Sequence, residues 1–502
     1  MRFIFDNLAV IFIAALTGLM AWMYGGTRTD TIVTYVPWLL LFMFEMIIAF
    51  PQKARGESTG DARERVWSDI KKDPLVWTAF GFLVLLAIPF ANNGLCVNCD
   101  RALIALGHSP KPPIEFLPFC VDRYLHLGVF LWFAVAFTGM IATKHCLRRR
   151  GKRLLLKMIV WNGFALAILG FVQAASGAEG PLWQKITNVE NASDFFSTFG
   201  YPNMAGDYFT TLFALSIAVW RREVDDAEHE RSNNATDRKK SAHGAFWRKH
   251  IYLVPASIMF FAAVNTLSRA AIMLVTLLLA VAFFHAFVSF THPLRRSEKV
   301  RRGTIALGCV AFVAFLAISS LPDDVQREVD TIDATEVLTR VTGKGQYHVR
   351  VATAIWQDHL LFGIGGWGYK HFCVPYMTEA EYKQLQVVGG INVHNDYLQF
   401  LAEHGAVGFG ALVAIVIMLL VPVGISWKTL ASAARFVEAK KAPPRPRAVF
   451  ALPAPAFMIL SAATATFIHS FGDCPLRSPA VLTLLLVSLA AIPGFLPKKE
   501  RS

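Results

Sequence analysis

Residues 393–405 read VHNDYLQFLAEHG and lie in the longest polar stretch between two apolar runs of the chain. A histidine, an asparagine and an aspartate follow one another here, as His394-Asn395-Asp396. The apolar runs themselves contain almost no ionisable side chains. We therefore expect the chemistry of this protein to take place within residues 350–408, with the remaining chain holding or facing this segment.

The composition is that of a membrane protein. Hydrophobic residues make up 54% of the 502 positions and charged residues 17%, whereas soluble globular proteins have about 45–50% and about 25%. The net charge of +13 would suit a nucleic-acid-binding protein. Lys and Arg are concentrated in short loops between apolar runs, however, which indicates an inner-membrane protein and argues against a nucleic-acid partner.

Apolar runs of roughly 17–25 residues, the length of a helix that crosses the bilayer, recur along the chain. They predict an all-α polytopic membrane protein of about twelve transmembrane helices. We place these at residues 8–24, 31–50, 75–92, 124–142, 154–176, 204–220, 251–267, 270–290, 303–321, 406–425, 450–470 and 478–494. The first run lacks a convincing signal-peptide cleavage site, so we expect it to be a span.

A cytoplasmic N-terminus puts most of the 49 Lys and Arg residues on the cytoplasmic side, as the positive-inside rule requires. The predicted parts are then helices 1–9 (1–321), a large periplasmic loop (322–405), and helices 10–12 with a basic tail (406–502). The loop is too long to lack structure. It contains two helical patterns, at 346–360 and from about Asn392 to Gly405.

His394 is a candidate general base. If Asn392 is the N-cap of the second helix, the imidazole lies in the first helical turn, where the helix dipole keeps it neutral. A neutral imidazole can accept a proton from a hydroxyl. The alternative is a capping or hydrogen-bonding histidine at the membrane surface, and the spacing favours neither interpretation.

Two arginines are candidates for binding an anion. Arg269 follows Leu267-Ser268 between two apolar runs, at the outer membrane boundary, where a charge normally has a partner. A guanidinium there offers a bidentate fork to an anion, although it could also snorkel to the interface. Arg350, on the helix 346–360, would alone be a surface charge. Together with Arg269 and His394 it suggests a basic pocket for a phosphate-bearing lipid.

Three further motifs are less specific. Gly363, Gly365 and Gly368 match a dinucleotide-binding fingerprint, but they follow a helix instead of a strand, so we expect a turn that lets the backbone approach a ligand or helix closely. The segment 469–477 either completes the pocket or caps helix ends. Cys96, Cys99 and Cys120 lie on the outer side, where a disulfide is an option that the sequence leaves open and zinc is less favoured.

Several motifs resemble the bacterial O-antigen ligase and polymerase superfamily. The matching segments are FGYPNMAG (199–206), LSR (267–269), Arg350 ahead of FGIG (362–365), HNDYLQ (394–399) running to EHGAVG (403–408), and Asp473 with PLR (475–477). The resemblance covers roughly residues 195–480.

The resemblance implies a metal-independent, inverting glycosyltransferase without a cofactor in the bacterial inner membrane. Its expected partners are an undecaprenyl-diphosphate-linked glycan donor, a glycan or lipid A-core acceptor, and membrane lipids. By position, His394 would be the general base or acceptor-orienting group, and Arg269 and Arg350 would hold the diphosphate. Other expected substrate-binding residues are Asn203, Asn395, Asp396, Asp473 and Arg477.

Two alternatives remain. The enzyme could be a polymerase of carrier-linked repeat units instead of a ligase, and the sequence does not distinguish these two activities. A lipid-linked glycan transporter is less favoured, because it would place charges in the middle of spans and show related halves.

Overall fold

The computed structural model describes residues 6–92, 112–184, 195–233, 250–291, 347–388, 392–439 and 452–496. Within these ranges the structure is helical apart from turns and an isolated bridge between Phe196 and Phe199. The predicted all-α class is therefore confirmed. The chain forms two compact units. The first consists of Met1–Arg148, Asp333–Leu419 and Thr466–Ala490, and the second of Arg149–Ile332, Leu420–Ala465 and Ala491–Ser502.

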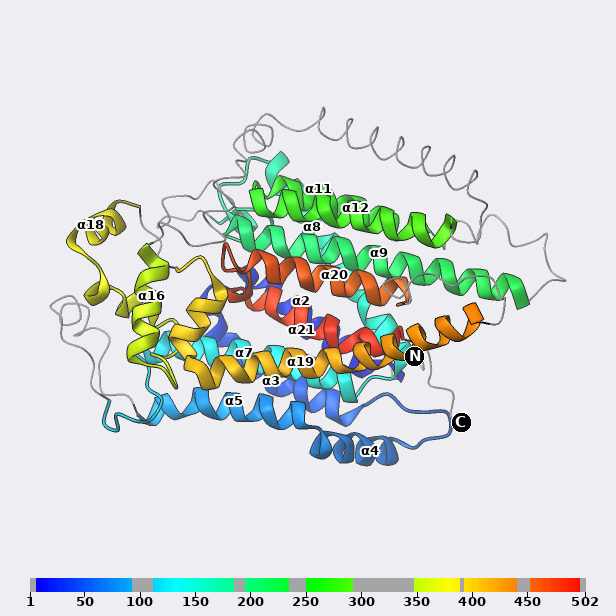
Figure 1. Ribbon diagram of the computed structural model, residues 1–502, viewed down its shortest axis with the longest axis horizontal. Coiled ribbons are helices and arrows are strands. Elements are labelled where there is room, and N and C mark those ends of the chain that lie inside the picture. Colours follow the sequence, from blue (N-terminus) through cyan, green and yellow to red (C-terminus); the bar gives the residue numbers. More distant parts are fainter. Residues whose placement is uncertain are drawn as a thin grey trace. The chain divides into compact units, whose positions relative to one another are not determined.

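The first unit is built around helix α7. Its helices are α2 (Leu8–Trp22), α3 (Thr29–Ala49), α4 (Thr59–Lys72), α5 (Pro74–Ala91), α7 (Arg123–His145), α16 (Tyr347–Asp358), α17 (Tyr369–Phe372), α18 (Glu379–Val388), the first part of α19 (Asp396–Ala439) and most of α21 (Pro479–Ala491), with 3-10 turns η1 (Tyr24–Gly26), η3 (Val374–Tyr376) and η5 (Pro475–Arg477). Helix α7 contacts α2, α3 and α5 (Figure 1). Its Trp132, Phe133 and Phe137 are fully buried and form the centre of this unit.

Short polar side chains fix where several helices of this unit begin. Ser58 and Asp61 form a capping box at the start of α4, and Asp73 caps α5 ahead of Pro74. Asp122 accepts hydrogen bonds from the backbone N–H groups of the first turn of α7. Such caps satisfy donors that a helix leaves unpaired at its N-terminus, so the charged residues between apolar runs also mark the helix boundaries.

The second unit is built around helix α9. Its elements are α8 (Arg149–Ala175), α9 (Pro202–Asn233), α11 (Leu253–Asn265), α12 (Arg269–Thr291), the end of α19 and most of α20 (Ala454–His469), with turns η2 (Pro181–Trp183) and η6 (Ile492–Gly494). Helix α9 contacts α8, α11 and α12. Gly206 of α9 lies against Ala271 of α12, so closely that an added Cβ would collide with it. Small residues allow this close approach of apolar helices.

The predicted spans agree with the observed helices wherever the structure describes them. Each of them is helical, except that the span expected at 303–321 lies outside the described residues. Among the described helices, six are long and apolar enough to cross a membrane: Thr29–Ala49, Pro74–Ala91, Arg123–His145, Arg149–Ala175, Arg269–Phe287 and Asp396–Lys428. Four shorter apolar helices are present as well, whereas α9 is not among the six. A total of twelve spans stays a prediction.

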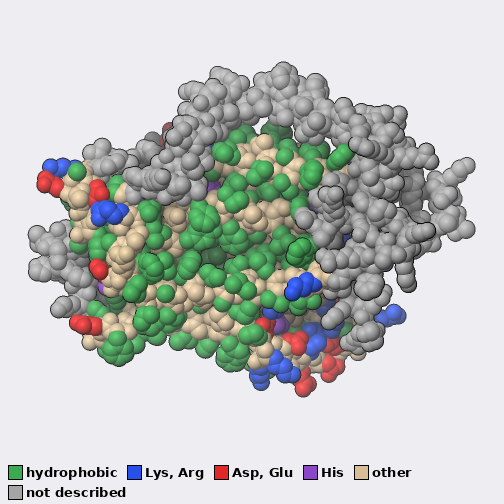
Figure 2. Space-filling view, in the orientation of Figure 1, with side chains coloured by type: hydrophobic (Ala, Val, Ile, Leu, Met, Phe, Trp, Pro, Cys, Tyr) green, Lys and Arg blue, Asp and Glu red, His purple; other side chains and the backbone are tan. Residues whose placement is uncertain are grey.

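Large apolar side chains on the outside of the first unit are consistent with a lipid environment. Trp38, Phe80 and Ile417 are 75%, 56% and 58% exposed. Figure 2 shows hydrophobic side chains along α5 and α19, and charged side chains gathered over α4 and α18. Apolar surface of this extent is rare on soluble monomers, so the exposed side chains favour contact with hydrocarbon.

Glycine residues let the turn after α16 dock on the backbone of α19. The amides of Ile364 and Gly365 donate to the carbonyls of Ala402 and Glu403 at 3.1 and 2.8 Å. Gly405 has φ 63° and ψ −175°, a kink within α19, and the next amide, from Ala406, donates to Leu360 at 2.8 Å. The expected close backbone approach is confirmed here, and its partner is a helix. The helix that was expected to end at Gly405 is indeed interrupted at this residue, and the second helical part of α19 follows the kink directly.

We predict that Gly405→Ala destabilises the protein by about 3 kcal/mol, because the combination of positive φ and extended ψ is nearly exclusive to glycine. An added Cβ would also collide with the backbone of Leu361 and Phe362. The measurement is thermal unfolding of the purified protein in detergent. Gly410→Ala is the matched control, since no atom lies within 4 Å of its added Cβ, and an equal loss in both variants would contradict the explanation.

Candidate active site

His394 lies in a turn just before α19, not within the helix. The helix begins at Asp396, and the Oδ1 atom of Asn395 accepts the N–H of Leu398 at 3.0 Å, so Asn395 acts as the N-cap. His394 has φ 51°, in the left-handed region. The prediction that Asn392 caps the helix and places His394 in its first turn is therefore wrong, because Asn395 takes the capping role.

The partner of His394 is Asp473 from the turn that follows α20. Nδ1 of His394 lies 3.4 Å from Oδ1 of Asp473, and their side chains are 43% and 5% exposed. Burial alone would raise the pKa of Asp473, but the hydrogen bond and charge of His394, together with the charge of His469 and the Cys474 N–H, hold it well below its usual range. Asp473 is thus a carboxylate that accepts a hydrogen bond from Nδ1, which leaves Nε2 as the ring nitrogen able to accept a proton.

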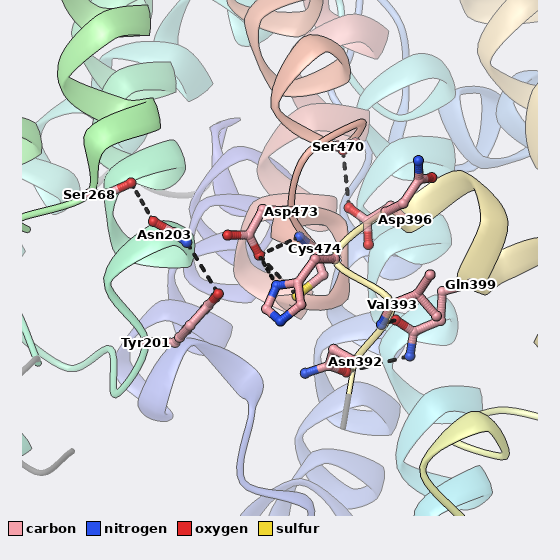
Figure 3. A network of polar contacts seen from close by, with 12 residues as sticks. Tyr201, Asn203, Ser268, Asn392, Val393, Asp396, Gln399, Ser470, Asp473 and Cys474 are labelled. Atoms are coloured by element: carbon pink, nitrogen blue, oxygen red, sulfur yellow. Dashed lines mark hydrogen bonds and ion pairs between the residues drawn. The ribbon is translucent and has the colours of Figure 1, made fainter. Parts of the chain in front are cut away.

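Asp396 fixes the start of α19 to the turn 470–476. Its backbone N–H donates to the Ser470 carbonyl at 2.9 Å. Its Oδ2 atom accepts hydrogen bonds from the Ser470 hydroxyl at 3.0 Å and from the Leu476 N–H at 2.8 Å (Figure 3). Asn395 adds a bond from Nδ2 to the Phe471 carbonyl at 3.2 Å. These contacts bring together His394 and Asp473, which are 79 residues apart in the sequence.

A buried ion pair supports the same turn from the core of the first unit. Arg477 donates from Nη1 to Oε2 of Glu403 at 2.9 Å, and both side chains are 1% exposed. The guanidinium also lies 4.0 Å over the ring of Trp367, and the backbone N–H of Trp367 donates to Glu403. The pair gives Arg477 a structural partner, and its predicted role in substrate binding stays a prediction.

Gln399 connects this ion pair to the His394 turn. Its Nε2 donates to Oε1 of Glu403 at 3.2 Å, and its Oε1 accepts the N–H of Val393 at 3.1 Å. Val393 precedes His394 directly. A continuous series of polar contacts therefore runs from Arg477 to the backbone of the turn that carries the imidazole.

Arg350 lies on α16 and faces α18. Its Nη2 donates to Oε2 of Glu381 at 2.6 Å and to the Tyr376 carbonyl at 3.0 Å. The side chain is 52% exposed, and its Nε and Nη1 have no acceptor among the described residues. Arg350 is thus a half-exposed cation with hydrogen-bond donors to spare. The neighbouring cations Arg340 and Lys344 lie outside the described residues.

A second histidine, which sequence reasoning missed, shares the first unit with His394. His348 on α16 contacts the Tyr369 hydroxyl through Nδ1 at 2.9 Å. Burial, together with the charge of His394, lowers the pKa of His348 to about 4, so this ring is neutral near pH 7. Its position two residues before Arg350 is the signal that could have drawn attention to it.

In the second unit, Asn203 is bonded to the break that precedes Arg269. Ser268 donates to Oδ1 of Asn203 at 2.5 Å and caps α12 by accepting the Ala271 N–H at 3.2 Å. Nδ2 of Asn203 donates to the Tyr201 hydroxyl at 3.1 Å (Figure 3). Arg269 is the first residue of α12, which confirms the tight break between two apolar helices. Binding of an anion by this guanidinium stays a prediction.

The described cysteines, Cys120, Cys146, Cys373 and Cys474, are free thiols and buried. Of the three cysteines considered for a disulfide, Cys96 and Cys99 lie outside the described residues.

Part of the chain matches a known protein family. Residues 254–413 match the family described as O-antigen ligase. They extend from α11 into α19 and include Arg269, Arg350 and His394. No curated protein sequence matches the chain. The family match agrees with the motifs quoted from the sequence and supports the O-antigen ligase and polymerase superfamily as the family of this chain.

Proposed function

We propose that this protein is an O-antigen ligase-like glycosyltransferase of the bacterial inner membrane. It transfers a glycan from an undecaprenyl-diphosphate carrier to an acceptor hydroxyl at the periplasmic face of the membrane. The observation that carries the proposal is the pair formed by the part-exposed His394 and the buried Asp473. His394 lies within the segment of the family match, and Asp473 lies outside it but contacts His394. A histidine oriented by a buried carboxylate is a recurrent general-base arrangement.

The proposed reaction is a single displacement. Nε2 of His394 accepts the proton of the acceptor hydroxyl as the hydroxyl oxygen attacks the anomeric carbon. The bond between that carbon and the diphosphate oxygen breaks on the opposite face, and the electron pair leaves with the diphosphate. Configuration at the sugar inverts, and Asp473 stabilises the imidazolium that forms.

Guanidinium groups can stabilise the diphosphate that leaves. Arg350 retains unused donors, and Arg269 opens a helix whose N-terminus also favours negative charge. Permanently charged, bidentate donors suit a diphosphate, and stabilisation of the leaving charge can replace the metal ion that other transferases use. We assign Asn203, Asn395 and Asp396 to holding the segments that present these groups.

The proposed topology follows the sequence. About twelve helices cross the membrane, and residues 322–405 form a periplasmic loop that carries the donor site and connects, along the chain, the helices of residues 1–321 to those of residues 406–502. The acceptor is lipid A-core in the ligase and a second carrier-linked repeat unit in the polymerase. The chemistry of His394 is the same in both cases.

The function is tested by deleting the gene and complementing it with wild type or His394→Ala. We expect wild type to restore lipopolysaccharide capped with long glycan, and His394→Ala to reduce transfer by a factor of about 10² to 10⁴, because the general base is lost. The measurement is a glycolipid gel, with protein level in the membrane followed by immunoblot.

The carrier-linked glycans that accumulate in the deletion strain show which of the two acceptors the enzyme uses. Long carrier-linked chains that accumulate indicate a ligase, whereas single carrier-linked repeat units indicate a polymerase. His359→Ala is the control, since it removes a ring that packs against Phe119 and Phe372 in the same unit. Full transfer by His394→Ala at normal protein level would refute the catalytic assignment.

Asp473→Asn tests the orienting carboxylate. Transfer should fall by about two orders of magnitude, because the amide no longer imposes the Nδ1–H tautomer. The residual activity should persist to lower pH than in wild type, because the imidazolium loses its counter-ion and forms less readily. The pH–rate profile checks this, and an unshifted acid limb would mean that Asp473 acts on the fold instead of on His394.

Arg269→Ala should raise the KM for the carrier-linked donor, with Arg269→Lys intermediate, because lysine keeps the charge but loses the bidentate fork. Donor KM is measured in detergent with a purified carrier-linked substrate. Arg28→Ala is the matched control. Arg28 is exposed and paired with Asp30, so its loss should leave KM unchanged. Equal KM values for all variants would remove Arg269 from donor binding.

A further inference from the structure

Three side chains with different metal-ligating atoms converge at the turn after α20. They are Nδ1 of His394, Oδ1 of Asp473 and Sγ of Cys474, and all three atoms lie within 4.8 Å of one another. Oδ1 of Asp473 is 3.4 Å from the histidine nitrogen and 3.3 Å from the cysteine sulfur. Figure 3 shows Asp473 and Cys474 side by side in this turn. The proposed transfer uses His394 and Asp473 but assigns nothing to the thiol.

The spacing of these atoms fits a tetrahedral ion. Zinc bonds of about 2.0–2.2 Å to nitrogen and oxygen and about 2.3 Å to sulfur place neighbouring ligand atoms about 3.4–3.6 Å apart. Two of the three separations in the cluster already have nearly this length. The third needs an approach of about one ångström, and the His394 side chain, which is 43% exposed, has room for this movement.

The ligand atoms select the kind of ion. One nitrogen, one oxygen and one sulfur suit zinc, a borderline-soft cation, whereas Mg²⁺ and Ca²⁺ require a larger set of oxygen atoms. The Cys474 N–H donates to Oδ1 of Asp473 at 2.7 Å and thereby orients the carboxylate, as outer contacts do around metal ligands. Asp473 and Cys474 are buried and His394 is half exposed, so an ion would arrive from the side of His394.

We propose that His394, Asp473 and Cys474 form a binding site for Zn²⁺, and that occupation of this site inhibits the enzyme. The inhibition, though not the binding, rests on the proposed function. As zinc binds, a metal–sulfur bond forms and the thiol proton passes to the buffer. Nδ1 of His394 bonds to the metal, the ring proton resides on Nε2, and Nε2 then has no lone pair to accept the proton of an acceptor hydroxyl. Zinc therefore turns the imidazole into the tautomer that cannot act as a base.

Binding is tested with Co²⁺, whose bond to a thiolate gives a charge-transfer absorption band. The full-length protein in detergent carries Cys96→Ser and Cys99→Ser, so that this closely spaced pair does not contribute. We expect the band to appear with one equivalent of Co²⁺ and to vanish on addition of Zn²⁺. Cys474→Ser should weaken binding by about 100-fold or more, whereas Cys373→Ser, another buried thiol in the same unit, should keep the band. No band, or an equal band in Cys474→Ser, overturns the site.

Inhibition is tested separately by glycan transfer in the presence of Zn²⁺ or a chelator. Each variant is compared with its own rate in the chelator. We expect Zn²⁺ to stop transfer by the parent protein and to affect Cys474→Ser at about 100-fold higher concentration or more. An active parent that binds Co²⁺ yet resists Zn²⁺ overturns the inhibition. A cobalt band in a protein without transferase activity would instead support the metal site and refute the proposed function.

Discussion

The buried ion pair between Arg477 and Glu403 is the interaction on which the arrangement of the first unit depends. Removal of two charges from water costs several kcal/mol for each ion, and such a pair is tolerated only when hydrogen bonds satisfy the remaining atoms. Glu403 meets this condition with the backbone N–H of Trp367 and the amide of Gln399. On Arg477, Nε and Nη2 have no hydrogen-bond partner among the described residues, and the ring of Trp367 lies against the guanidinium instead. Loss of either charge would leave the other unpaired in the core, at a cost of roughly 3–5 kcal/mol. The pair therefore holds α19, the glycine turn and η5 in one arrangement.

The same pair explains how a strained turn persists next to the catalytic candidate. A histidine with φ in the left-handed region costs about 1–3 kcal/mol unless its surroundings fix it. Two sets of contacts do so. Gln399 holds the Val393 N–H on one side of His394, and Asp396 binds the turn 470–476 on the other. The backbone position of His394 is thus determined by its neighbours in the fold, which suits a residue whose ring must meet a reacting hydroxyl.

The sequence was sufficient to predict the helices but not the contacts of the site. Apolar runs and capping residues such as Asp73 and Asp122 carry local information, so the all-α class and the helix positions could be derived from them. The contact between His394 and Asp473 joins residues 79 positions apart, and no local pattern encodes it. The sequence also could not decide between Asn392 and Asn395 as the N-cap. Asparagine is a favoured N-cap residue, and both positions lie shortly before the helical pattern. Asn395 caps the helix by accepting the N–H of Leu398, and its side chain is held there by a bond to the carbonyl of Phe471, a residue that only the fold brings near.

The requirement for a directed imidazole links the proposed catalysis to the proposed inhibition. A carboxylate that accepts a hydrogen bond from Nδ1–H fixes the tautomer needed for a base, and the same carboxylate and nitrogen are two ligands of a tetrahedral metal site. Cys474 adds the third ligand atom because its backbone N–H caps Asp473, which places its sulfur beside the same oxygen. Proton and zinc ion therefore compete for one nitrogen, and each determines the state of the other ring nitrogen. A serine at position 474 would preserve the backbone cap but provide a much weaker zinc ligand, so the thiol affects metal sensitivity without a part in the transfer step.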